Sequence, residues 1–149
     1  MMPIEIRSSS FDPWDEIKLH QQKMNQKMNM TGQYGATASF IGTMRDFNEG
    51  ESVQSMTLEH YPGMTEKHLE EICRDANEQW NLLDTLILHR IGEIQIADPI
   101  VLVCVWSAHR AEAFDACRFI MEDLKSKAPF WKQESIESGK RWVDKNTPG

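Results

Sequence analysis

The side chains best suited to chemistry in this chain are basic, and one pair stands at a predicted helix start. His109 and Arg110 follow the apolar run 100–106 and precede a helical pattern. Backbone N–H groups and the helix dipole attract anions at such a position, and these two side chains add hydrogen-bond donors. The pair therefore predicts an anion site, although an ordinary polar helix start has the same residues.

A second group of basic residues lies in the segment 125–141. The segment holds five basic and two acidic residues, a local charge of +3 in a chain whose net charge is −7. Such a spot on an acidic protein suits a small anionic ligand or an acidic partner, and the alternative is a solvated lysine-bearing face. The basic members are Lys125, Lys127, Lys132, Lys140 and Arg141.

Lys125 has an unusual place on its predicted helix. At about 100° per residue it lies near Phe114 and Met121, at the edge of the apolar stripe. A lysine there is partly desolvated, and a second cation such as Lys132 would lower its pKa further. The alternative is an aliphatic stem packed on the surface with its ammonium group in water.

One helix cannot bring all the basic residues together. Arg110 and Lys125 are 15 residues apart, which is about 22 Å along a straight helix. If both serve one site, the second set comes from another subunit, and a symmetric dimer with two shared sites follows. Arg45 is a lone basic residue after a predicted strand, suited to phosphate binding or to solvent.

Hydrophobic periodicity predicts the elements that position these residues. Pro129 ends the predicted helix that carries Lys125, and an irregular segment is expected around 130–131. The pattern indicates an α+β domain with a mostly antiparallel sheet and two main helices packed on it. Residues 1–32 are expected to be a partly flexible N-terminal extension, and 33–149 a single domain. The predicted strands are 34–40 and 53–60, joined as a hairpin through the turn residues 48–50, then 86–91, a central strand at 100–106 and a short strand at 141–143. The first predicted helix is 65–80, capped by Thr65. The second starts around 107–110 and runs until Pro129.

Composition excludes several classes of protein. A length of 149 residues and a pI near 5.2 indicate one acidic domain. A protein that binds double-stranded nucleic acid is disfavoured, because neutralising the phosphates needs a clustered excess of basic residues. No apolar run approaches the roughly 20 residues of a membrane span, and the N-terminus lacks a secretory signal. We therefore expect a cytoplasmic protein.

The cysteines and histidines show no metal-binding pattern. The cysteines, at positions 73, 104 and 117, form no CxxC pair, and the five histidines form no HExxH motif. We expect three buried thiols in a reducing compartment and no metal site. A cysteine-dependent hydrolase is disfavoured because Cys104 lies in an apolar strand.

Several runs together resemble the large, catalytic subunit of molybdopterin synthase. The similarity extends from Gly35 to Val143, and the runs are GTMRDFNEG (42–50), LEHYPGMTEK (58–67), HRIGEI (89–94), SAHRAEAF (107–114), FIMEDLKSKAPFWK (119–132) and RWV (141–143). The resemblance implies an α/β hammerhead fold and a homodimer. A small ubiquitin-like sulfur carrier would bind at each end, completing a heterotetramer.

The resemblance also implies the reaction. The carrier's Gly-Gly thiocarboxylate tail would enter the large subunit's pocket, and two sulfurs would pass to cyclic pyranopterin monophosphate. The dithiolene of molybdopterin would form without a bound metal or cofactor. The runner-up is a non-catalytic anion-binding or sulfur-carrier docking module, which would tolerate replacement of Lys125 with alanine.

Matching positions assign the site residues. Lys125 is expected to be the main general acid or base, with a nucleophilic role as the alternative, and Lys132 to assist it. Arg45, His109 and Arg110 are expected to hold the phosphate. Thr43, Met44, Gln133 and Glu134 complete the predicted substrate-binding set, and Phe40 and Met121 are expected to line the pocket.

Overall fold

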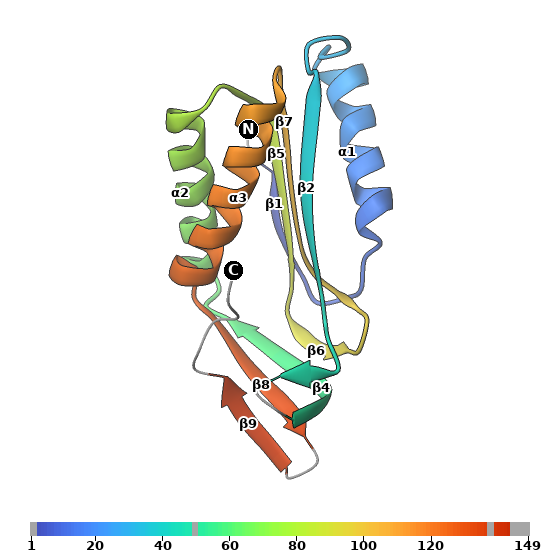
Figure 1. The fold of residues 1–149 in the computed structure, drawn as a ribbon, viewed down its shortest axis with the longest axis vertical. Helices are drawn as coiled ribbons and strands as arrows, with labels where there is room; N and C mark the ends of the chain where they lie inside the picture. Colours follow the sequence, from blue (N-terminus) through green and yellow to red (C-terminus); the bar gives the residue numbers. More distant parts are fainter. Residues whose placement is uncertain (1–2, 49–50, 137–138, 144–149) are drawn as a thin grey trace.

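The part of the chain that the structure describes forms an upper four-stranded sheet and a lower five-stranded sheet (Figure 1). The computed structural model describes residues 3–48, 51–136 and 139–143. The upper sheet has the order β1-β5-β7-β2, in which β1 runs parallel to β5 and the other pairs are antiparallel. Its strands are β1 (Ile4–Arg7), β5 (Leu82–Arg90), β7 (Pro99–Ser107) and β2 (Ala36–Thr43). The predicted α+β class and the central strand at 100–106 are confirmed.

Helices cover both faces of the upper sheet. Helices α2 (Met64–Gln79) and α3 (Arg110–Lys127) pack on one face, and α1 (Pro13–Lys27) lies on the other (Figure 1). Strand β7 is therefore buried on both sides, which explains its unbroken apolar run. Val101, Val103 and Val105 face α2 and α3, whereas Leu102, Cys104 and Trp106 face the α1 side.

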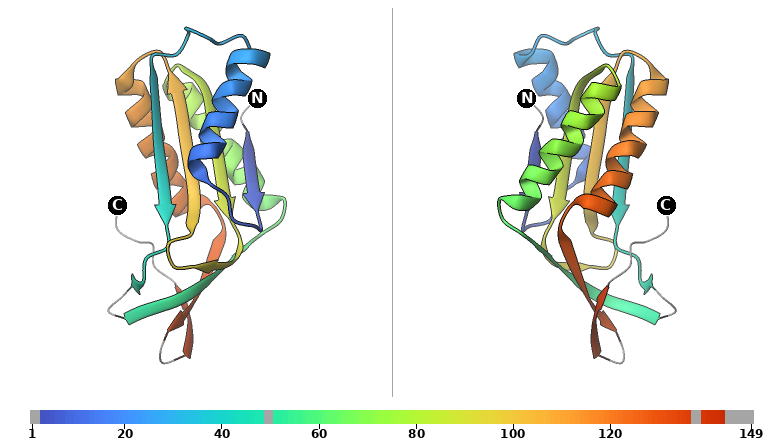
Figure 2. Two further views of the ribbon diagram at one scale, coloured as in Figure 1. Left: turned by 90° about the vertical axis from the view of Figure 1, so that its right-hand side faces the viewer. Right: turned by 90° about the vertical axis from the view of Figure 1, so that its left-hand side faces the viewer.

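The N-terminal segment is part of the folded domain, which differs from the expected flexible extension. Strand β1 joins the sheet edge beside β5, and α1 lies along the sheet (Figure 2). Asp12 caps α1, because its carboxylate accepts hydrogen bonds from the backbone N–H groups of Trp14 and Asp15. Met24 is fully buried, and His20 Nε2 lies 2.8 Å from Oδ2 of Asp84 on β5. Only a narrow stripe of α1 side chains touches the sheet, and the rest of the helix is polar. Hydrophobic periodicity therefore gave little indication of this helix.

The lower sheet is built on β4 (Glu51–His60). Its other strands are β3 (Phe47–Asn48), β6 (Gly92–Gln95), β8 (Phe130–Ile136) and β9 (Gly139–Val143). The predicted hairpin of 34–40 with 53–60 is wrong, because β2 pairs with β7 and β4 pairs with β3, β6 and β8. The irregular chain expected at 130–131 is also wrong, since these residues begin β8. Residues 49 and 50 of the predicted turn lie outside the described residues.

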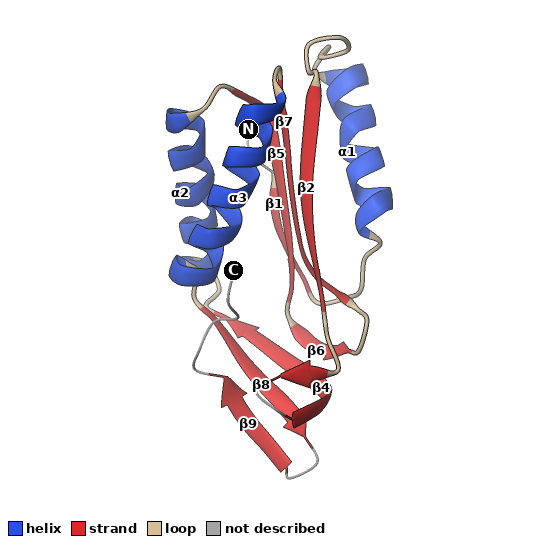
Figure 3. Cartoon of the chain, in the orientation of Figure 1, coloured by secondary structure: helices blue, strands red, loops and turns tan. Residues whose placement is uncertain are grey.

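The helices gather on the upper sheet, and within the described ranges none lies on the lower one (Figure 3). None of the helices described is long and apolar enough to cross a membrane.

Thr65 does not cap α2 but ties it to the end of α3. Gly63 is the N-cap residue, and its N–H donates to the Glu66 carboxylate at 3.1 Å. The buried Thr65 hydroxyl instead donates to the Pro129 carbonyl at 3.0 Å. This contact holds the turn that leads from α3 into β8.

Gly35 brings β2 against the loop that precedes α3. Its N–H donates to the Ser107 carbonyl at 3.0 Å, and a Cβ atom at this position would lie 2.5 Å from the Ala108 carbonyl oxygen. We expect Gly35→Ala to lower the free energy of unfolding by about 1–3 kcal/mol, because backbone must move to admit the methyl group. Thermal unfolding checks this against Ser39→Ala, a substitution at an exposed position of β2. Equal melting temperatures for the two variants would contradict the expected clash.

Candidate active site

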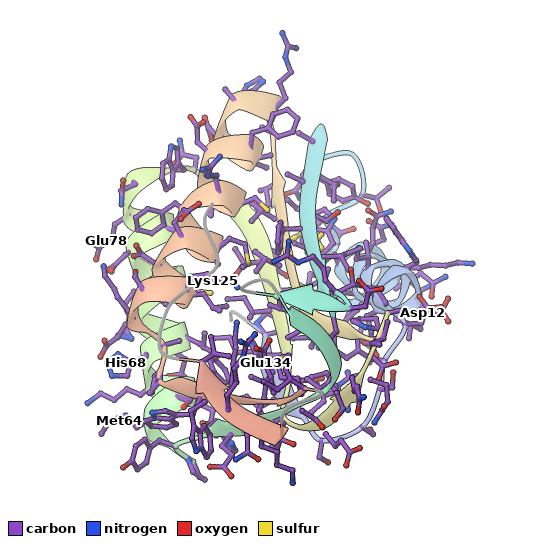
Figure 4. All side chains as sticks on the ribbon, turned by 60° about the horizontal axis from the view of Figure 1, so that its bottom comes forward. Asp12, Met64, His68, Glu78, Lys125 and Glu134 are labelled. Carbon is purple, nitrogen blue, oxygen red and sulfur yellow. The ribbon has the colours of Figure 1, made fainter. Side chains whose placement is uncertain are left out.

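A cavity of about 180 Å³ lies where β2, α3 and β8 converge. Lys125 comes from the last turn of α3, whereas Lys132 and Glu134 come from β8. Lys125 and Glu134 both line this cavity, and Figure 4 labels them on the side where α3 meets the lower sheet. The predicted site residues that line this cavity are Phe40, Thr43, Met44, Arg45, Lys125, Lys132 and Glu134.

Local structure explains why these residues meet. Helix α3 ends at Lys127 before Pro129, and the chain turns directly into β8. Strand β8 alternates its side chains, so Lys132 and Glu134 share one face. Arg45 follows the end of β2, close to the bulge between Gly42 and Thr43 where that strand departs from regular pairing with β7.

The two lysines are electrostatically coupled. The pKa of Lys132 falls to about 8. Burial is the largest cause, followed by the positive charge of Lys125 and a hydrogen bond with it, while Glu134 opposes the shift. The lowered pKa of Lys132 itself is a feature that the sequence did not lead us to expect. A lysine titrating near pH 8 can lose and regain a proton under mild conditions.

Glu134 is a buried carboxylate with a cross-strand partner. It is 5% exposed, and its Oε1 accepts a hydrogen bond from Arg141 Nε at 3.1 Å. The two residues are directly opposite in the β8–β9 register. Sequence reasoning placed Arg141 in the basic segment but did not assign it to the site. Its partner depends on strand register, which composition does not reveal.

The remaining predicted residues do not line this cavity. His109 and Arg110 are exposed at the N-terminus of α3, whereas Lys125 lies at its other end, as helix geometry required. Gln133 alternates with the two lining residues of β8 and so points to the other face. Met121 is buried in the core between α3 and the upper sheet.

The cysteines lie in the core, as expected. All three are buried and free. Burial raises the pKa of Cys73 to about 11, of Cys104 to about 12 and of Cys117 to about 11. Because the thiolate is the reactive form, these residues are poor nucleophiles. Within the described residues, no three His, Cys, Asp or Glu side chains gather as a metal site would require.

Comparison with known proteins places this arrangement in a family. The model of the family described as MoaE protein matches residues 15–127. The molybdopterin synthase catalytic subunit of Ralstonia nicotianae is 59% identical over 144 residues, which cover 97% of this chain and 78% of that protein.

Solved structures of similar proteins have the same fold. The molybdopterin biosynthesis MoaE protein from Burkholderia ambifaria is 40% identical, with a TM-score of 0.78 over 100% of this chain and 93% of that one. The same fold occurs in a complex of subunits 1 and 2 of molybdopterin-converting factor from Helicobacter pylori. The matching chain of that complex is 20% identical, with a TM-score of 0.77 over 95% of this chain and 90% of that chain. Because the family match begins at residue 15, it includes most of α1. The chain belongs to the MoaE protein family.

Proposed function

We propose that this chain is the catalytic subunit of a molybdopterin synthase, a sulfurtransferase acting on cyclic pyranopterin monophosphate. The observation that carries the proposal is the coupled pair Lys125 and Lys132, which share a cavity with Arg45. The relative from R. nicotianae bears the name of this activity. A cavity with three cationic side chains and one carboxylate suits a phosphate-bearing substrate and a thiocarboxylate.

The chemistry divides between the two lysines. The thiocarboxylate sulfur of the carrier attacks a substrate carbon, and the C–O bond to the departing phosphate or hydroxyl oxygen breaks. Lys125 gives the departing oxygen its proton. Lys132, with a pKa of about 8, takes up and returns the proton through its hydrogen bond with Lys125. Water then cleaves the carrier thioester, leaving sulfur on the product and a carboxylate on the carrier, and a second carrier repeats the transfer.

Arg45 holds the phosphate in this scheme. It lines the same cavity, and a guanidinium group binds phosphate oxygens through two parallel hydrogen bonds. As the cyclic phosphate opens, negative charge develops on the leaving oxygen, and a fixed guanidinium stabilises that charge.

A second subunit completes the site in our proposal. The single-chain cavity of about 180 Å³ is smaller than the roughly 300–1,000 Å³ of typical ligand sites. His109 and Arg110 are exposed at a helix N-terminus, where an anion is favoured. We assign them to the partner subunit's cavity across a twofold axis. In our proposal a small ubiquitin-like sulfur carrier at each end completes a heterotetramer. The H. pylori complex of subunits 1 and 2 supports the presence of a small partner subunit.

The decisive experiment reconstitutes the reaction. The chain is mixed with a thiocarboxylated carrier and cyclic pyranopterin monophosphate, and molybdopterin is measured with carrier binding. Product is the expected result. Carrier binding without product would overturn the catalytic assignment in favour of a docking module.

A further inference from the structure

His89 is a buried histidine that the sequence analysis did not single out. It lies near the end of β5 and is 5% exposed. Its Nδ1 lies 2.8 Å from the Arg90 carbonyl oxygen. Since a carbonyl only accepts hydrogen bonds, Nδ1 carries the proton. The imidazole ring stacks on Phe130, with centroids 3.8 Å apart and an angle of 13° between the planes.

The stack connects His89 to the strand that carries Lys132. Phe130 is the first residue of β8, and Lys132 follows two residues later on the same face. Strand β4 pairs with both positions, through His60 and Leu58 respectively. Thr65 holds the preceding Pro129 carbonyl from α2. The start of β8 is thus fixed from two directions, by the hydroxyl of Thr65 and by the ring of His89.

We propose that His89 is a positioning residue for Lys132, because its ring, oriented by the Arg90 carbonyl and stacked on Phe130, fixes the start of β8 and with it the approach of Lys132 to Lys125. The role of His89 in sulfur transfer rests on the function proposed above. The positioning itself is a property of the folded chain and can be measured without any substrate.

The charge state of His89 fits this role. Burial is the largest cause that lowers its pKa to about 4, and the positive charges of Lys132, Lys125 and His60 act in the same direction. The hydrogen bond to the Arg90 carbonyl opposes the shift. The ring is therefore uncharged throughout the range in which Lys132 titrates. An uncharged ring adds no further positive charge near the lysine pair.

Lysine side-chain NMR titration tests the proposal directly. The Lys132 signal is assigned with Lys132→Arg and followed from pH 6 to 11 in the full chain and its variants. We expect His89→Ala to raise the pKa of Lys132 by about one unit or more, because loss of the ring loosens β8 and admits water. His89→Phe retains an uncharged ring against Phe130, and we expect it to restore most of the original value. The control is His68→Ala, which removes a half-exposed histidine on α2.

Activity provides the second measurement. At pH 7.5, a rise of one unit from about 8 leaves roughly eightfold less of Lys132 deprotonated, and a comparable fall in sulfur transfer is expected for His89→Ala. His89→Phe should recover most of the rate. An inactive wild-type chain whose Lys132 nevertheless shifts on His89→Ala would refute the proposed function and support the positioning role.

Two results would overturn the proposal. One is an unchanged pKa of Lys132 in folded His89→Ala. The other is an equal rise in His89→Phe and His89→Ala, which would show that ring stacking is irrelevant. If His89→Ala does not fold, Phe130→Leu replaces it, because Leu keeps apolar volume on this half-buried residue but cannot stack. The pKa of Lys132 should then rise in Phe130→Leu, and an unchanged value would refute the role.

Discussion

Replacing Lys125 with alanine is expected to slow molybdopterin formation by about a hundred- to ten-thousandfold, the range that a positioned acid or base contributes. The residue lies at the cavity end of α3, where its charge and hydrogen bond act on Lys132. Its loss removes the proton donor for the departing oxygen and leaves Lys132 without its neighbour. The measurement is the rate of single-turnover product formation, with the carrier and the precursor each at a concentration well above its Kd.

Lys127→Ala is the matched control for this variant. Lys127 lies on the same last turn of α3, but its ammonium group is exposed and pairs with Asp123 at 3.0 Å. An exposed pair of this kind contributes little to stability, so the control should fold and turn over as the native chain does. A Lys125→Ala variant that folds, binds carrier and retains more than about a tenth of the native rate would refute the acid–base role.

Mixing two inactive variants is expected to restore activity if the site is shared. Arg110→Ala and Lys125→Ala each damage both sites of a homodimer. In a mixed dimer, one site receives Lys125 from one chain and Arg110 from its partner and is intact. Random mixing makes half of the dimers mixed, so about one quarter of the native activity should return. The assay is molybdopterin formation after the variants are unfolded and refolded together.

The control pair is Lys125→Ala with Lys132→Ala. Both lysines line one cavity of a single chain, so a mixed dimer of these variants contains no intact site. No activity should return. Recovery in this control pair, or its absence in the first pair when mixed dimers are present, would contradict the shared site.

Local patterns in the sequence predicted the parts of the fold that depend on local interactions. The unbroken apolar run of β7 indicated a central strand, and the stripe on α3 placed Lys125 at its edge. The length of that helix also showed that Arg110 and Lys125 serve different ends. Each of these inferences depends only on residues near one another in the sequence.

Strand pairing could not be predicted in the same way. Alternation in 53–60 indicated a strand but gave no partner, and the predicted strand 34–40 was the wrong choice, because it pairs with β7. The pairing of β8 with β4 and β9 brings Lys132, Glu134 and Arg141 into register. The contacts of His89 likewise join residues that are distant in the chain. Such contacts depend on global topology, which a single sequence pattern does not contain.

The parallel pairing of β1 with β5 has a consequence for biosynthesis. Ile4 is opposite Ile87, so β1 can pair only after the intervening chain through β5 has been synthesised. Until β1 docks, the outer hydrogen-bonding edge of β5 is open to a strand from another nascent chain. Because closing so long a loop is slow, we expect the docking of β1 on β5 to be a late step of folding, although β1 is synthesised before β5.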